Sequence, residues 1–301
     1  MALNWIDVKD FSFHSLLLLE RFQIRLLCGI EDPSFQASLS LALGRHPAVA
    51  WYLAHRCPEC ADTVTRLVAR APQEASYEDL RRCELAVLSR VEDFITYTRP
   101  ELMDTHCGFI AHWEPARLLE LADFRNKTVL DVGSGSGRLA FAAAGLAREV
   151  YACEPVGTLR EYLRDRSRRE GIANLRVVDG MADSLPYPDQ LFDIVMSGHV
   201  VGDDYDGELS ELTRVTKSGG WLIDCPGEET HRSPNQELLR RGWELLPYSS
   251  ALGGQVYRYR KLVTDKPDAK GAVLQSIAAR PFFVLSAYWP PTIIWRLACV
   301  R

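Results

Sequence analysis

Three glycines at alternate positions, Gly133, Gly135 and Gly137, join a β-rich run to a helix-forming run. The run before them, residues 128–132, reads Thr-Val-Leu-Asp-Val, and helix-forming residues follow from Leu139. Glycine reaches backbone angles that other residues rarely adopt, and the free N–H groups at a helix start attract negative groups such as a carboxylate. The sequence therefore predicts a strand, a ligand-binding loop and a helix in direct succession. An ordinary strand-to-helix turn is the alternative.

From residue 127 onward, short β-rich runs alternate with helical runs, which is typical of βαβ units and a largely parallel sheet. The predicted strands are 128–132, 149–153, 175–178, 192–197, 220–224, 243–248 and 255–263. The predicted helices are 139–147, 156–169, 207–215 and 234–241. No helix separates the last two strands, which predicts an antiparallel hairpin. The expected fold class is α/β, a seven-stranded doubly wound, Rossmann-like sheet.

Before the sheet, from residue 10 to about residue 118, apolar residues recur at helical spacing. The predicted helices cover 13–27, 48–53, 61–68 and 77–95. Ser76, followed by Asp79, is a suitable helix start because both side chains stabilise the free N–H groups there. We expect a helical accessory domain over 1–110, the α/β domain over 111–267, and a tail over 268–301 whose fold the sequence does not define.

Composition favours a folded, soluble protein that acts on small molecules. Hydrophobic residues make up 47% of the 301 residues, and 35 basic against 40 acidic residues give a net charge of −5. No global basic field therefore attracts nucleic acid. Eight cysteines are too few for a disulfide scaffold, so reduced thiols in the cytoplasm are expected. The N-terminal segment does not look like a signal peptide, and prolines and an arginine interrupt the apolar stretch 281–300, so no membrane span is expected.

The glycine loop itself distinguishes between ligand classes. A dinucleotide-binding motif places its third glycine where this chain has Arg138, which leaves a nicotinamide oxidoreductase as a weaker alternative. The segment instead resembles motif I of the class I S-adenosylmethionine-dependent methyltransferases, D-x-G-x-G-x-G, matched by Asp131 and the three glycines. The resemblance implies that the glycines approach the methionine part of S-adenosylmethionine. It also implies that Asp131 orients the loop and the amino group of this cofactor.

Three later segments extend the resemblance in the same order and spacing. Glu154 lies 17 positions after Gly137, and a carboxylate there can accept two hydrogen bonds from ribose hydroxyls, the role of the matching acid in the family. Residues 180–193 resemble a segment of the subgroup that includes quinone-biosynthesis methyltransferases. Met181 departs from it, because many relatives carry an acid near the adenine amino group; a thioether can only pack on the ring. Residues 214–222 resemble the turn into the family's fifth strand.

The resemblance implies a methyltransferase that moves a methyl group by in-line attack to an unidentified small-molecule acceptor. The implied cofactor-binding residues are Asp131, Gly133, Ser134, Gly135, Gly137, Glu154, Pro155, Gly180, Met181, Ala182 and Ser197. Adenine recognition would rest on backbone groups or Asp183. The alternative is a non-catalytic protein of the same fold whose cysteine-containing helical region binds a partner or a metal. The acceptor, the methylated atom and the oligomeric state are not defined by the sequence.

His199, which follows the fourth predicted strand, is the candidate catalytic base because imidazole titrates near neutral pH. A hydrogen-bonded wall residue is the alternative. Asp203 and Asp204 are expected to be solvated or helix-start acids, with contact to a cationic acceptor as the other interpretation. The basic run 164–169 is expected to be a solvated helix face, and nucleic-acid contact is its alternative.

Two further groups of residues allow several interpretations. Cys57 and Cys60 form a C-x-x-C pair, which can be two packed thiols, half of a zinc site or a redox pair. No complete metal-ligand set is predicted. Aromatic and imidazole residues upstream of the glycine loop could cover the cofactor or only pack between domains. These residues are Tyr97, His106, His112 and Trp113.

Overall fold

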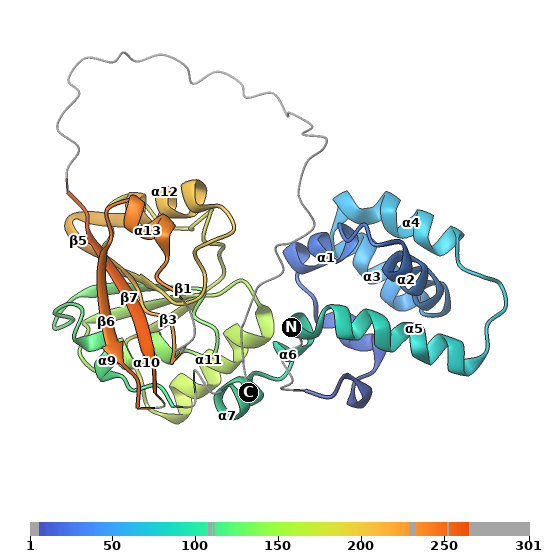
Figure 1. The fold of residues 1–301 in the computed structure, drawn as a ribbon, viewed down its shortest axis with the longest axis horizontal. Helices are drawn as coiled ribbons and strands as arrows, with labels where there is room; N and C mark the ends of the chain where they lie inside the picture. The colour runs from blue at the N-terminus through green and yellow to red at the C-terminus, as the bar shows by residue number, and fades with distance from the viewer. Residues whose placement is uncertain (1–5, 108–109, 111, 229–232, 252, 265–301) are drawn as a thin grey trace, which may run out of the picture.

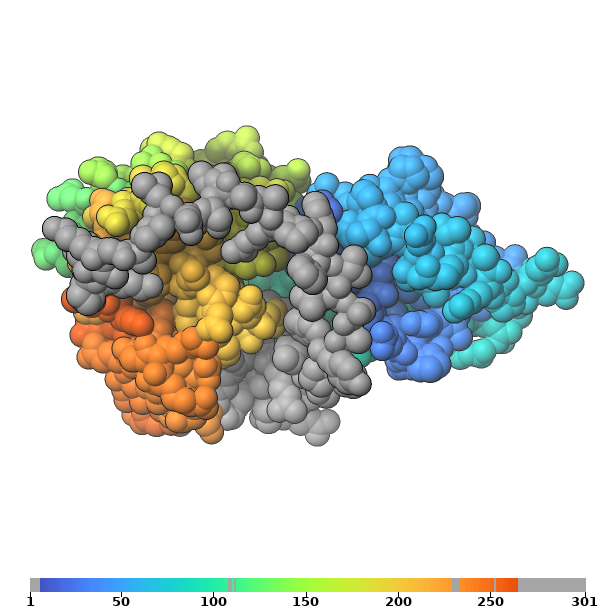
Figure 2. Space-filling model, turned by 90° about the horizontal axis from the view of Figure 1, so that it is seen from above, coloured from blue at the N-terminus to red at the C-terminus, as the bar shows by residue number. Residues whose placement is uncertain are grey.

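The computed structural model describes residues 6–107, 110, 112–228, 233–251 and 253–264. Helices gather in one lobe and the sheet lies in another, with α6 and α7 between them (Figure 1), and the view from above shows the two lobes side by side (Figure 2). The helices of the first lobe and its connection are α1 (Arg21–Cys28), α2 (Pro33–Arg45), α3 (Pro47–Arg56), α4 (Ala61–Ala69), α5 (Tyr77–Arg90), α6 (Glu92–Thr96) and α7 (Pro100–His106). Short 3₁₀ helices cover Val8–Asp10, Phe13–Leu18 and Pro58–Cys60.

The helical lobe has its own apolar core, whose largest buried residues include Phe13, Ile24 and Leu88. The single helix predicted over 13–27 is wrong. A 3₁₀ helix is followed by α1, because the backbone of Glu20 is extended and starts α1 through a capping box with Gln23.

Two other differences from the predicted helices have local causes. The predicted helix 77–95 is divided at Val91, whose backbone angles leave the helical region, so α5 and α6 are separate. Helix α2 was not predicted, although Asp32 caps its N-terminus and Pro33 occupies the first turn, a recognisable start signal. The predicted start at Ser76 is confirmed, since its side chain accepts a hydrogen bond from the Asp79 N–H.

The sheet has seven strands in the order β3-β2-β1-β4-β5-β7-β6. The strands are β1 (Thr128–Val132), β2 (Glu149–Cys153), β3 (Leu175–Val178), β4 (Phe192–Ser197), β5 (Thr216–Asp224), β6 (Glu244–Ser249) and β7 (Gln255–Leu262). The first five are parallel, and β7 runs antiparallel to both β5 and β6. The predicted α/β fold and its terminal hairpin are confirmed. Strand β5 begins earlier than predicted because Thr216 already pairs with Phe192 before an irregularity in the register.

Helices cover the sheet on both faces. They are α9 (Ala116–Leu119), α10 (Arg138–Ala144), α11 (Gly157–Arg169), α12 (Tyr205–Val215) and α13 (Gln236–Arg240). All five residues of β1 are buried, and successive side chains enter opposite cores: Val129 packs in the core with α10, and Leu130 in the core with α12. In the described ranges, no helix is long and apolar enough to cross a membrane.

Strands β1 and β4 are neighbours at the centre of the sheet. The connection after β1 leads to β2 on one side of this pair, and the connection after β4 leads to β5 on the other side. Such a reversal creates a crevice at the carboxyl ends of the strands. The glycine loop after β1, the turn after β2 and the loop after β4 therefore meet at one edge of the sheet.

Candidate functional site

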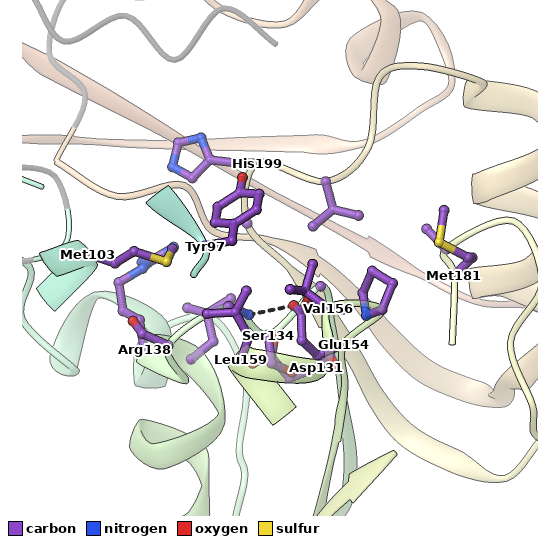
Figure 3. A pocket seen from close by; sticks show the side chains of 18 of the residues that line it. Tyr97, Met103, Asp131, Ser134, Arg138, Glu154, Val156, Leu159, Met181 and His199 are labelled. Atoms are coloured by element: carbon purple, nitrogen blue, oxygen red, sulfur yellow. Dashed lines mark hydrogen bonds between the residues drawn. The ribbon is translucent and has the colours of Figure 1, made fainter. Parts of the chain in front are cut away.

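A cavity of about 220 Å³ lies at this edge and is lined by both lobes (Figure 3). Ten of the residues expected at the site line it: Asp131, Gly133, Ser134, Gly135, Glu154, Pro155, Gly180, Met181, Ala182 and His199. Gly137 and Ser197 do not line it. Ser197 is fully buried, and its hydroxyl lies 3.3 Å from a carboxylate oxygen of Asp224.

The glycine loop has a shape that side chains would prevent. Gly133 has a φ of 65°, and a Cβ atom there would lie 2.4 Å from a methyl carbon of Val200. Gly137 has a φ of 98°, and a Cβ there would lie 2.5 Å from the ring of Phe141. Gly137 thus ends the loop and allows α10 to begin, whereas Gly133 leaves its backbone at the cavity wall.

Glu154 is buried and already holds the loop. One carboxylate oxygen accepts a hydrogen bond from the Gly135 N–H, and the other accepts one from the Val156 N–H, both at 2.9 Å. Burial raises the pKa of Glu154 to about 7, although these hydrogen bonds oppose that rise. Each carboxylate oxygen has a second lone pair, so the residue can still accept from ribose hydroxyls.

Asp131 is the buried acid at the end of β1, with 1% of its surface exposed. Within the described part of the chain, its Oδ2 atom has no hydrogen-bond partner. Burial raises the pKa of Asp131 to about 7, and the nearby Arg138 opposes the rise. A buried carboxylate oxygen without a partner, at the wall of a cavity, fits a ligand ammonium such as the amino group of S-adenosylmethionine.

Arg138, which occupies the position of the missing third dinucleotide glycine, has a structural role. Its guanidinium donates a hydrogen bond to the Cys225 carbonyl at 2.8 Å and lies over the Trp113 ring at 4.5 Å. These contacts hold the cation at the wall of the cavity beside Asp131.

The segment expected at the adenine lies across the cavity from Met103 (Figure 3). Met181 accepts a hydrogen bond from the Ser184 N–H at its carbonyl, which closes a tight turn. Asp183 is exposed and is not among the residues that line the cavity. Of the two expected sources of adenine recognition, only the backbone of Gly180, Met181 and Ala182 lies at the cavity.

His199 follows β4 with a φ of 67°, a conformation that non-glycine residues rarely adopt. Its Nε2 atom accepts a hydrogen bond from the Gly227 N–H at 3.0 Å. In the neutral ring the hydrogen therefore lies on Nδ1. Of the two acids beyond it, Asp203 lines the cavity, whereas Asp204 caps α12 by accepting from the Gly207 N–H.

The other wall of the cavity comes from the helical lobe. Its side chains are Phe22, Asp93, Phe94, Tyr97, Met103 and Ile110. Only Tyr97 was singled out from the sequence; His106 and His112 are exposed away from the cavity, and Trp113 packs under Arg138. The apolar wall residues look like ordinary core residues in the sequence, and Asp93 looks like an ordinary acid in a first helical turn, so no local signal marks them.

Hydrogen bonds accepted by two acidic side chains of the helical lobe attach this lobe to the glycine loop and to α11. Glu20 accepts from the Gly157 N–H at 2.8 Å. Asp104 accepts from the Ser136 hydroxyl at 2.5 Å and from the Tyr162 hydroxyl at 2.6 Å. The wall from the helical lobe is therefore fixed against the loop.

The remaining candidates lie away from the cavity. The sulfur atoms of Cys57 and Cys60 are 3.1 Å apart, and burial raises the pKa of both thiols. Among the residues that the structure describes, no group of three or more His, Cys, Asp or Glu could hold a metal ion. In the basic run, Arg164 and Arg168 are exposed as expected, but Arg166 lies over the ring of Phe141 and is half-buried.

Comparison with known proteins supports the same interpretation. A family model described as "Methyltransferase domain" matches residues 130–224. A demethylmenaquinone methyltransferase of Thermobifida fusca is 31% identical over 176 residues, which cover 56% of this chain and 69% of that protein. An uncharacterized methyltransferase of Bacillus subtilis is 31% identical over 37% of this chain and 43% of its own length, so the match spans less than half of that relative.

Among solved structures, a methyltransferase from Aquifex aeolicus described as SAM-dependent aligns with a TM-score of 0.43 and 21% identity, over 54% of this chain and 95% of that chain. The Bacillus subtilis YcgJ protein aligns with a TM-score of 0.36 and 27% identity, over 36% and 48%. The motifs, the order of the strands and the match to the Thermobifida relative agree. The chain belongs to the class I S-adenosylmethionine-dependent methyltransferases, related to those of quinone biosynthesis, and its cofactor is S-adenosylmethionine.

Proposed function

We propose that the protein transfers the methyl group of S-adenosylmethionine to a small molecule that binds in the same cavity, by in-line nucleophilic attack. One observation carries this proposal: the cofactor loop and the apolar wall of the helical lobe line a single cavity. The loop side offers backbone and carboxylates, and the helical side offers Phe22, Phe94 and Met103. An apolar wall facing a charged cofactor site suits an acceptor with an apolar body.

The bound cofactor supplies a methyl group on a positively charged sulfur, which is already an excellent leaving group. The chain therefore has mainly to hold the two reactants in line and to exclude water. Glu154 would bind the ribose hydroxyls and Asp131 the amino group, while the backbone at Gly180–Ala182 would contact the adenine. The helical wall would position the acceptor.

For His199 we propose a role in positioning. Its Nε2 lone pair is already used by the Gly227 N–H, so this atom is not available to remove a proton in the observed conformation. Replacing His199 with Ala would then lower turnover by a constant factor between about pH 6 and pH 9. If His199 were a base, the loss of turnover in His199→Ala would depend on pH.

We also propose the domain division 1–110 and 111–267. The helical core, which extends from Phe13 to Ile95, and the two cores of the sheet consist of different residues, which supports this division. Residues 268–301 lie outside the described residues. A cytoplasmic location is proposed because the seven described cysteines, from Cys28 to Cys225, are free thiols.

Two measurements test the proposed function. Calorimetry should show binding of S-adenosylmethionine and S-adenosylhomocysteine, and none of NAD. Incubation with methyl-labelled S-adenosylmethionine and a cell extract should then place label in the small-molecule fraction. Binding without any labelled product would favour the alternative, a non-catalytic binding protein. Label found only in macromolecules would contradict the small-molecule acceptor.

A further inference from the structure

One acid in the cavity wall comes from the helical lobe and is not among the residues proposed above to bind the cofactor. Asp93 lies in the first turn of α6, on the helical lobe, and lines the cavity together with Phe22, Phe94 and Tyr97. In the described part of the chain, its carboxylate makes no hydrogen bond or ion pair to another side chain. Burial, together with the neighbouring Glu92, raises the pKa of Asp93 to about 6, and the positive charge of the N-terminus opposes that rise. A carboxylate in apolar surroundings without a partner is unfavourable until a ligand supplies one.

The other charged groups of the cavity do not supply that partner. The guanidinium of Arg138 is held by the Cys225 carbonyl and the Trp113 ring. His199 accepts a hydrogen bond at Nε2, which is the behaviour of a neutral ring. Glu208 accepts from the Gly202 N–H.

Among the described residues that line the cavity, acids outnumber cations. Asp131 and Glu154 would face the positively charged cofactor, which leaves Asp93, Asp203 and Glu208 on the walls beyond it. An apolar cavity with excess negative charge selects for a cation attached to an apolar body.

We infer that Asp93 is a specificity-determining residue, contributed by the helical lobe, and that the acceptor is an apolar amine that carries a positive charge in solution. This inference rests on the proposed function. The carboxylate of Asp93 would pair with the ammonium group of the acceptor and so hold the acceptor nitrogen in the cavity. Tyr97 would stay protonated beside it, because burial and the charge of Asp93 raise the pKa of the phenol.

The implied reaction balances without another reactant. The ammonium group loses one proton through Asp93 to solvent, and the nitrogen lone pair then forms the new bond to the methyl carbon. The carbon–sulfur bond breaks with its electron pair on sulfur. The products are a methylated ammonium ion, S-adenosylhomocysteine and one proton, so the total charge is unchanged.

A matched pair of probes tests the inference on the full chain. Binding of S-adenosylhomocysteine is measured first, and its failure would contradict the proposed function. The saturated protein is then titrated at about pH 7.5 with 2-naphthylmethylamine and with 2-naphthylmethanol, which differ in the charged group alone. We expect the amine to bind at least about tenfold more tightly, the scale of a hydrogen bond to a charged group.

Three variants connect that preference to Asp93. Asp93→Asn should reduce the preference for the amine to less than about threefold and leave the affinity for the alcohol within about threefold of the parent value. Asp93→Glu should keep most of the preference for the amine. Asp62→Asn, an exposed acid on α4, is the matched control and should behave as the parent does. Thermal unfolding checks that each variant folds.

Several results would overturn the inference while leaving the proposed function intact. These are equal affinities of the parent for the two probes, no binding of the amine, or a preference that survives in Asp93→Asn. If Asp203→Asn alone abolishes the preference, the cation is recognised at the other wall and Asp93 does not determine specificity.

Discussion

The two lobes line one cavity with chemically different groups. The α/β lobe offers backbone groups and buried carboxylates, such as the Gly133 loop and Glu154. The described residues that the helical lobe contributes are mainly apolar, such as Phe22 and Met103, with one acid among them, Asp93. In the proposed function, the α/β lobe binds the cofactor and the helical lobe binds the acceptor. Changes in the α/β lobe should therefore act on cofactor affinity, and changes in the helical lobe should leave it nearly unaltered.

The largest effect is expected from Gly133→Ala. The new methyl group would meet Val200 at 2.4 Å in a backbone conformation that alanine rarely adopts, so the loop must move. Affinity for S-adenosylmethionine should fall by about 100-fold or more in calorimetry. Gly171→Ala is the matched control, because Gly171 has a similar φ of 67° with no atom near its Cβ position. Equal losses of affinity in Gly133→Ala and Gly171→Ala would contradict the assignment of the glycine loop to the cofactor site.

Replacing Glu154 with Ala should have the next largest effect. The change removes the acceptor for ribose and releases the Gly135 N–H, so cofactor binding should weaken by about 1.5 to 3 kcal/mol, or roughly 10-fold to 150-fold. Glu149→Ala, at the other end of the same strand, is the control and should bind as the parent does. Unchanged affinity in Glu154→Ala would exclude this residue from the cofactor site.

Cofactor affinity should also depend on pH through Asp131 and Glu154, since burial raises the pKa of each to about 7. A cationic ligand binds the ionised form, so affinity should rise by about eightfold for each group that must be ionised, or about 70-fold for both, as pH rises from 6 to 7.5. The folded, ligand-free protein keeps protons that the unfolded chain has released above about pH 4, so its free energy of unfolding should fall as pH rises to 7. Calorimetry in buffers of different ionisation enthalpy would detect the released protons. A flat pH profile would contradict both assignments.

The smallest effect on the cofactor is expected from Glu20→Ala in the helical lobe. The change removes the acceptor for the Gly157 N–H and should lower the free energy of unfolding by about 1 kcal/mol. Affinity for S-adenosylmethionine should change by less than about threefold. A loss as large as that of Glu154→Ala would show that the helical lobe also binds the cofactor, and the division of labour between the lobes would be wrong.

The two lobes also differ in how much of each could be predicted from the sequence. The strands and the glycine loop were predictable because buried parallel strands and positive φ angles restrict which residues can occupy them. The wall from the helical lobe was not, because Phe94 and Met103 come to the cavity only through the docking of α6 and α7. The hydrogen bond between His199 and Gly227 was equally hidden, since it depends on the path of a loop 28 residues later. The break before α1 follows from the extended Glu20 backbone, which apolar spacing does not reveal.

The hydrogen bond from the Gly135 N–H to Glu154 fixes the loop through a contact within the protein itself. A rigid receptor loses little conformational entropy when its ligand binds. Its shape alone does not distinguish between molecules that share the same nucleoside and amino-acid parts. The methyl donor and the demethylated product share those parts and differ in one methyl group and one positive charge. Under the proposed function, release of the demethylated product would depend on electrostatics, because the acidic walls attract the positively charged donor more strongly than the neutral product.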